Sequence, residues 1–311
     1  MSEQIYAIGT PGQPWGDAEK AMWLQQQQVQ RSYQQQVVTV IQQLATELAA
    51  VADLCQYGEL DYQQFGLSKY PLFALKSRDW QPSKPMVLVT GGVHGYESSG
   101  VFGALQFVRE HFARYSQQVN LLVLPCISPW GFETINRWNP LAVDPNRSFT
   151  ADSRSPEAAA VLALVQSFPT PLVHVDLHET TDSDNSEFRP AKAARDGTVD
   201  INWNIPDGFY LVGDSDNPQP EFQAAIIAQV AKVTQIAPAD EHGCIIGEEL
   251  QQFGVINYPK KALFLCGGMT NATFVTTTEV YPDSPNTSVA ACNLAQVVTV
   301  CSAIDFALSH R

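Results

Sequence analysis

The chain has 311 residues, of which 45% are apolar, and a formal net charge of −14 at pH 7. The apolar share is ample for a folded core, and α/β proteins of this length often form one domain. The negative charge argues against nucleic acid and acidic membranes as partners, because both select clustered Lys and Arg, and it modestly favours neutral or cationic substrates.

The predicted elements begin at residues 17–53, whose apolar side chains have helical spacing, so we expect 1–53 to be a mostly helical segment packed on the rest of the chain. Short apolar runs farther along predict strands at 72–75, 86–90, 121–124, 172–177, 209–212, 263–265 and 274–277. Helical spacing between many of these runs predicts helices at 97–114, 155–167, 219–236 and 286–309. The polar region 180–207 is expected to be a loop that lines a cleft.

Apolar strands that alternate with helices are typical of a sheet that is buried on both faces and largely parallel in its middle. The sequence contains no internal repeat and no linker rich in Pro, Gly or Ser. We therefore predict an α/β fold with a single domain over 1–311, in which helices flank a mixed, centrally parallel β-sheet on both faces.

Targeting signals are not evident in the sequence. The first residues, Met-Ser-Glu-Gln-Ile-Tyr, lack the basic and apolar regions of a secretory signal, and the run of roughly 18 apolar residues that a membrane span needs is missing. The six cysteines form no C-x-x-C pair and mostly lie in apolar runs, which favours reduced thiols. We therefore expect a cytoplasmic protein without a membrane span, whose oligomeric state the sequence leaves open.

Residues 87–100 join a predicted strand to a predicted helix and read Val-Leu-Val-Thr-Gly-Gly-Val-His-Gly-Tyr-Glu-Ser-Ser-Gly. The two glycines permit a sharp turn, so His94 and Glu97 lie at the strand-to-helix junction. Imidazole and carboxylate are both good zinc ligands, and a catalytic zinc takes three protein ligands and leaves one position for water. The pair by itself is more often an ordinary helix start, so a metal site needs further support.

Four further motifs follow in order: Ser-Pro-Trp-Gly through Arg137, then Asp-Pro-Asn-Arg at 144–147, then Val-His-Val-Asp-Leu-His at 173–178, and Thr-Thr-Thr-Glu at 276–279. With the first motif, this series resembles the M14 zinc carboxypeptidases and their relatives, the succinylglutamate desuccinylases and aspartoacylases. That group shows H-x-x-E, N-P-x-G with an arginine, D-x-N-R, a histidine that ends a strand, and a glutamate on a strand. The resemblance spans 87–281, about two thirds of the chain.

The resemblance implies one zinc ion bound by His94, Glu97 and His178. It also implies that Asp144 accepts a hydrogen bond from His94 and so fixes the orientation of that ring. His174 shares the His178 face of its strand but lies farther from the carboxyl end, where ligands gather in open α/β sheets. We therefore expect His174 to be a core histidine.

The resemblance also implies roles in binding and cleaving a substrate. Glu279 would act as general base, and Arg137 would stabilise the oxyanion. Asn146 and Arg147 would hold a terminal carboxylate, for which the planar fork of arginine is well suited. Tyr258 is the best candidate for the tyrosine that closes over the substrate in larger carboxypeptidases.

Three functions are compatible with these motifs. The favoured one is a zinc carboxypeptidase acting on peptides with a free C-terminus, whose specificity pocket lies between Tyr258 and Glu279 and includes Thr270. The second is an N-acyl amino acid deacylase of the aspartoacylase and succinylglutamate desuccinylase type, although those relatives usually carry a C-terminal β-domain where this chain reads as one helix. The third is a zinc-binding module without turnover, against which the presence of Glu279 and Arg137 argues.

Overall fold

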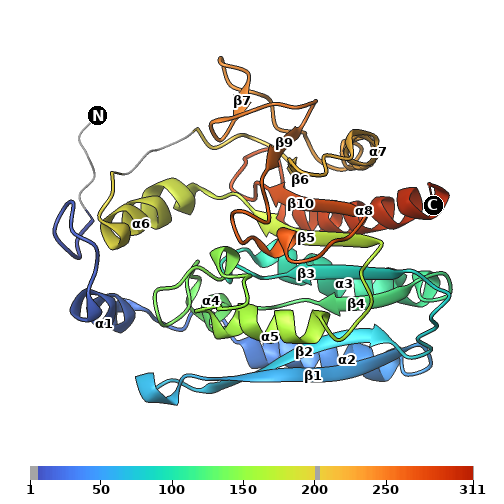
Figure 1. The fold of residues 1–311 in the computed structure, drawn as a ribbon, viewed down its shortest axis with the longest axis horizontal. Helices are drawn as coiled ribbons and strands as arrows, with labels where there is room; N and C mark the ends of the chain where they lie inside the picture. The colour runs from blue at the N-terminus through green and yellow to red at the C-terminus, as the bar shows by residue number, and fades with distance from the viewer. Residues whose placement is uncertain (1–5, 200–203, 311) are drawn as a thin grey trace.

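The computed structural model describes residues 6–199 and 204–310, and its central feature is a sheet in the order β1-β2-β4-β3-β5-β10-β6-β9 (Figure 1). A separate pair, β7 and β8, lies outside this sheet. In chain order the strands are β1 (Ala52–Asp61), β2 (Lys69–Ser77), β3 (Met86–Gly91), β4 (Asn120–Leu124), β5 (Val173–Glu179), β6 (Tyr210–Asp214), β7 (Cys244–Ile245), β8 (Glu248–Glu249), β9 (Val255–Tyr258) and β10 (Phe274–Val280).

The middle of the sheet is parallel, because β4, β3, β5 and β10 all run in the same direction. The antiparallel strands β1 and β2 form one edge, and β6 runs antiparallel to β10 toward the other edge. Every residue of β3, β4 and β5 is buried. Strands covered on both faces read as continuous apolar runs, and the predicted fold class is confirmed.

Helices cover both faces of the sheet. Figure 1 shows α5 in front of the strands and α2, α3 and α8 behind them. The helices are α1 (Asp17–Gln26), α2 (Thr39–Glu47), α3 (Ser98–Tyr115), α4 (Pro129–Thr134), α5 (Pro156–Val165), α6 (Arg189–Asp196), α7 (Pro220–Val230) and α8 (Val289–Ser309). Among the described residues, α8 is the one helix long and apolar enough to cross a membrane by length and composition, but it packs on α3, α7 and the sheet.

Three predicted elements differ from the structure. The apolar run 263–265 is a turn, because Leu265 N donates to Lys260 O and Phe264 takes a left-handed φ of 53°. The helical region ends before residue 53, since β1 begins at Ala52 with a half-exposed pattern that is typical of an edge strand. The region 180–207 contains a π-helical turn and α6 where a loop was expected, and its residues 200–203 lie outside the described residues.

Two glycines hold the turn after β3 in place. Gly92 has a φ of +59°, which glycine adopts without strain. Gly95 lies against α4, where an added Cβ would come within 1.9 Å of the carbonyl carbon of Gly131 and 2.0 Å of the amide nitrogen of Phe132. The close approach of these two backbones places the segment 92–97, and with it His94, at the edge of the sheet.

Replacing Gly95 with alanine should therefore destabilise the fold, because the clash involves backbone atoms that cannot rotate away. We expect Gly95→Ala to lower the free energy of unfolding in urea by about 3 kcal/mol or more. Gly58→Ala is the matched control, since its Cβ would meet nothing closer than 3.5 Å. Equal unfolding midpoints for the two variants would contradict this account of the turn.

Candidate active site

Three central strands bring the candidate residues together at the carboxyl ends of the parallel strands. His94 follows β3, His178 lies near the carboxyl end of β5, and Glu279 lies near the carboxyl end of β10. Because these strands are parallel, their carboxyl ends meet at the same edge, where ligands bind in open α/β sheets. His178 and Glu279 are partners in the β5–β10 register, so residues 101 positions apart lie side by side.

The backbone of His178 is held from two sides. Its amide nitrogen donates to Thr278 Oγ1 over 3.1 Å, and its carbonyl oxygen accepts from Gln296 Nε2 over 2.9 Å. Gln296 is a buried residue of α8, which packs behind β5 and β10. The ring at position 178 is therefore carried by a rigid element rather than by a mobile loop.

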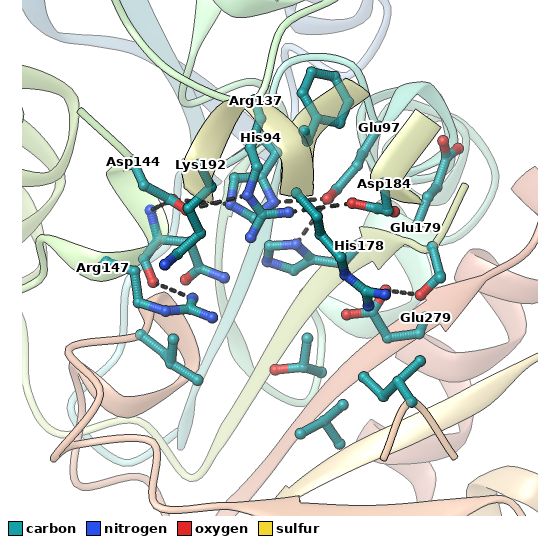
Figure 2. Close-up of a pocket in the computed structure, with 18 of the residues that line it drawn as sticks. His94, Glu97, Arg137, Asp144, Arg147, His178, Glu179, Asp184, Lys192 and Glu279 are labelled. Carbon is teal, nitrogen blue, oxygen red and sulfur yellow. Dashed lines mark hydrogen bonds and ion pairs between the residues drawn. The ribbon is translucent and has the colours of Figure 1, made fainter. Parts of the chain in front are cut away.

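The side chains of His94, Glu97 and His178 form a candidate metal centre, since one ligand atom from each lies within 4.8 Å of the others (Figure 2). Glu97 Oε1 lies 2.7 Å from His94 Nδ1, and Glu97 Oε2 lies 2.7 Å from His178 Nδ1. The second contact lacks hydrogen-bond geometry, so the buried Oε2 has no hydrogen-bond donor despite the short distance. Three converging donors with one orphaned oxygen fit a single cation bound between them.

Each of the two histidines is oriented by a second carboxylate. His94 Nε2 lies 3.0 Å from Asp144 Oδ1, and His178 Nε2 lies 3.0 Å from Asp176 Oδ2. In both rings Nδ1 therefore faces Glu97, which is the arrangement of a metal-ligating imidazole backed by a carboxylate. Asp176 was not among the predicted site residues, although its position two residues before His178 on the same strand face was a usable signal.

The electrostatics of this group favour a bound cation. Burial raises the pKa of Glu97, but His178 and His94 outweigh it and lower that pKa to about 2. Burial lowers the pKa of His178, whereas Glu97 and Asp176 raise it well above its usual value. Arg137 pairs with Asp144, and the remaining negative charge of Glu97 and Asp176 is compensated by a protonated imidazole or by a bound metal cation.

Glu97 is free to face the histidines because another residue caps its helix. It occupies the N-cap position of α3 without making a capping hydrogen bond. The Ser99 amide, in the first turn, donates instead to the carboxylate of Glu179. Glu179 is buried at the end of β5, and burial raises its pKa to about 7.

Glu279 is positioned by a hydroxyl chain. Its Oε2 accepts a hydrogen bond from Thr180 Oγ1 over 2.9 Å, and that hydroxyl lies 2.7 Å from the hydroxyl of Tyr210. Burial raises the pKa of Glu279 to about 8, although His178 acts in the opposite direction. A carboxylate with a raised pKa is a better proton acceptor than an exposed one.

Arg137 is tied to the metal centre through Asp144. Its Nε donates to Asp144 Oδ2 over 3.1 Å, so this carboxylate bridges the arginine and His94. Its Nη1 lies 3.3 Å from the hydroxyl of Tyr96, which donates to Asp184 over 2.9 Å. Tyr96 and Asp184 had no predicted role, and only the approach of residues 88 apart in sequence brings them together.

Asn146 and Arg147 lie in a 3-10 turn that follows Asp144. The backbone N–H of Asn146 donates to Asp144 Oδ1 over 2.9 Å. The side-chain oxygen of Asn146 accepts from the backbone nitrogen of Cys266 over 2.8 Å. The carboxamide therefore offers its NH₂ group as the donor for a ligand. Arg147 Nη1 donates to the carbonyl oxygen of Asn146 over 2.8 Å, which leaves the rest of its guanidinium for an anion.

All nine predicted site residues line one pocket of about 390 Å³. They are His94, Glu97, Arg137, Asp144, Asn146, Arg147, His178, Tyr258 and Glu279. In Figure 2, Arg147 and Glu279 lie on opposite sides of His178. Thr270, expected in the pocket, is buried outside its lining with its Oγ1 3.4 Å from His174 Nδ1, whereas Thr277 lines the pocket.

Known proteins share parts of this sequence and this fold. The family model of the succinylglutamate desuccinylase/aspartoacylase catalytic domain matches residues 83–197. No curated protein matches the sequence. A Shewanella amazonensis SB2B protein with a provisional assignment as a metallopeptidase is 18% identical with a TM-score of 0.66, over 90% of this chain and 98% of that one.

Two further solved structures with the same fold are carboxypeptidase-related. The metallo-carboxypeptidase of Burkholderia cenocepacia is 14% identical with a TM-score of 0.59, over 96% of this chain and 70% of that one. Bovine thrombin-activatable fibrinolysis inhibitor, solved with tick carboxypeptidase inhibitor, is 12% identical with a TM-score of 0.60, over 93% and 100%. The matched family model and the shared fold support the relationship to the M14 metallo-carboxypeptidases and the succinylglutamate desuccinylase/aspartoacylase group that the motifs indicate.

Proposed function

We propose that the protein is a zinc-dependent carboxypeptidase that hydrolyses the C-terminal peptide bond of peptides. The observation that carries this proposal is one pocket that holds together a metal-donor group, a buried carboxylate and the guanidinium of Arg147, which uses Nη1 to bond the Asn146 carbonyl oxygen. Two imidazoles and one carboxylate are the donor set of hydrolytic zinc centres. A binding module would have no use for the buried Glu279 beside that group.

The residues divide the reaction among them. His94, Glu97 and His178 would hold the zinc ion, which would supply Lewis acidity toward the substrate carbonyl and the attacking water. The carboxylate of Glu279, oriented by Thr180, accepts the proton of the attacking water and donates it to the leaving amine. Thr180 leaves the other oxygen of Glu279 free for this exchange.

Arg137 and Arg147 each stabilise one negative charge, the first on the carbonyl oxygen during the reaction and the second on the terminal carboxylate. Asp144 and Tyr96 fix the guanidinium of Arg137 beside the metal centre, where it stabilises the negative charge that develops on the carbonyl oxygen. Arg147 and the NH₂ group of Asn146 bind the terminal carboxylate of the peptide. The Tyr258 side chain lines the same pocket, and we assign it to covering the bound terminal residue.

A second candidate is an N-acyl amino acid deacylase, which the match of residues 83–197 to the succinylglutamate desuccinylase/aspartoacylase model favours. Both activities use a metal, a base and an arginine, so they differ in what the acyl side accommodates. An exopeptidase leaves room there for an extended peptide, whereas a deacylase encloses a small acid.

The metal assignment predicts a difference between two histidines of the same strand. His178→Gln should lower zinc affinity more than a hundredfold, beyond the 10–100-fold typical of losing an outer carboxylate. His174→Gln is the matched control, because the hydrogen-bond partners of the His174 ring among the described residues are two threonine hydroxyls, at 3.1 Å and 3.4 Å. Zinc per chain is measured by mass spectrometry after dialysis. Loss of zinc from His174→Gln alone would move the site to the group of His174, Asp176 and Cys266.

The base assignment predicts that Glu279→Gln keeps its zinc and its fold but loses at least a hundredfold in kcat, because glutamine preserves shape and cannot accept the proton. Glu179→Gln, a change of the same kind at a buried carboxylate that caps α3, should retain turnover. Peptide hydrolysis and zinc content are measured on both variants. Near-parental kcat in zinc-loaded Glu279→Gln would remove this residue from the reaction.

The anchor assignment predicts that blocked dipeptides and longer peptides with a free C-terminus are cleaved and that their C-terminal amides are poor substrates. Arg147→Ala should narrow the acid-to-amide ratio of kcat/KM by roughly thirty- to more than a hundredfold, since a charge-assisted contact contributes on the order of 2–3 kcal/mol. Arg154→Ala, at an exposed arginine farther along the chain, should leave the ratio unchanged. Cleavage confined to N-succinyl or N-acetyl amino acids would instead establish the deacylase.

A further inference from the structure

A lysine lies buried behind the wall of the pocket. Lys260 follows β9 in a turn, and its side chain has no exposed surface. Its Nζ donates to Thr277 Oγ1 over 2.6 Å, and no carboxylate of the described residues forms an ion pair with it. An ammonium group without a paired anion is costly to bury, so its retention calls for a ligand or a local charge that compensates it.

The loop after this turn is shaped around the lysine. A Cβ on Gly267 would lie 3.0 Å from Lys260 Nζ and 2.9 Å from Thr277 Oγ1, and a Cβ on Gly268 would lie 2.5 Å from the Lys260 carbonyl carbon. Burial lowers the pKa of Lys260 to about 8, while Asp176 and Asp214 raise it, so the amine is largely protonated at pH 7. The structure thus holds a positive charge at this point.

Thr277 connects that charge to the pocket. It precedes Glu279 by two residues on β10, so both side chains lie on the same face of the strand and both line the pocket. Because Lys260 donates to the Thr277 oxygen, the hydroxyl proton must point elsewhere, and no acceptor for it occurs among the described residues. The neighbouring pocket residues Val212 and Leu265 are apolar, which strengthens the field of the ammonium there.

We infer that Lys260, acting through the hydroxyl of Thr277, makes the pocket select a terminal residue with an acidic side chain. This inference rests on the proposed carboxypeptidase function. Arg147 binds the α-carboxylate, the Thr277 hydroxyl donates to the side-chain carboxylate, and Lys260 supplies the compensating positive charge behind it. Lys260 is a positioning residue in this scheme, because it polarises the contact without touching the substrate.

Lys260 could otherwise serve only as a counter-charge for Asp176 and Asp214. In that role its loss would change zinc affinity through Asp176, which orients His178, and would leave side-chain preference unchanged. Selection of an acidic residue and structural charge balance therefore predict different readouts for the same variant.

The test compares blocked dipeptides that share one acyl part and end in Glu, Gln, Leu or Lys. For the zinc-loaded protein we expect kcat/KM for Glu to exceed that for the isosteric Gln at least tenfold. Lys260→Met should bring this Glu-to-Gln ratio of kcat/KM close to one, mainly by raising KM for the Glu substrate, and should leave the zinc content unchanged. Lys261→Met is the matched control, since Lys261 is exposed and donates a hydrogen bond to Asn271 Oδ1. An equal rate for Glu and Gln in the parent, or an unchanged ratio in Lys260→Met, would overturn the inference.

A second variant and a binding measurement test the same preference without depending on Lys260→Met or on turnover. Thr277→Val, which removes only the hydroxyl, should also lose the preference, and it replaces Lys260→Met if that variant does not fold. Thermal stabilisation of zinc-loaded Glu279→Gln by glutamate and by glutamine reports binding without turnover, and glutamate should stabilise more. If no peptide is cleaved, the proposed function fails, while the binding comparison still decides whether an acidic side chain is preferred.

Discussion

The site depends on one buried carboxylate that faces two imidazoles. Glu97 directs one oxygen to each of His94 and His178, and both rings are backed by further carboxylates. Burying this much negative charge is costly unless a cation compensates it. The group is therefore organised for a cation between the two rings.

Rigid elements carry these donors. The ring at position 178 lies on a strand buried on both faces, and the segment with His94 is held by the contact of Gly95 with α4. Glu179 caps α3, which spares Glu97 from that task. Ligands on strand ends and tight turns lose little entropy on binding a metal, because their positions are already set by packing.

The net charge of the chain is opposite in sign to the charges of Arg147, which lines the pocket, and of Lys260 behind it. A formal charge of −14 suggested cationic or neutral ligands. Surface carboxylates are screened by solvent and salt over about 10 Å, whereas Arg147 lines the pocket and Lys260 is buried behind Thr277. In the proposed scheme these two cations determine which ligand the pocket accepts, and the acidic surface affects only the approach of charged molecules.

What the sequence by itself determined are the features written in short spacings. Continuous apolar runs predicted the buried parallel strands, and the motifs around His94, Asp144, His178 and Glu279 predicted which side chains would share a pocket. Those signals are local, because strand burial and turn chemistry depend on neighbouring residues. The strand predicted at 263–265 was wrong, because an apolar run by itself does not distinguish a strand from a buried turn.

Only the tertiary structure decided which residues support the predicted ones. The Tyr96 hydroxyl donates to Asp184, 88 positions away, and Lys260 donates to Thr277 from a turn that the spacing of apolar residues does not predict. It also replaced Thr270 by Thr277 as the polar residue of the pocket. Such contacts arise from strand register and chain crossing, which bring together residues with no spacing rule between them, so their chemistry becomes visible only once the sheet has formed.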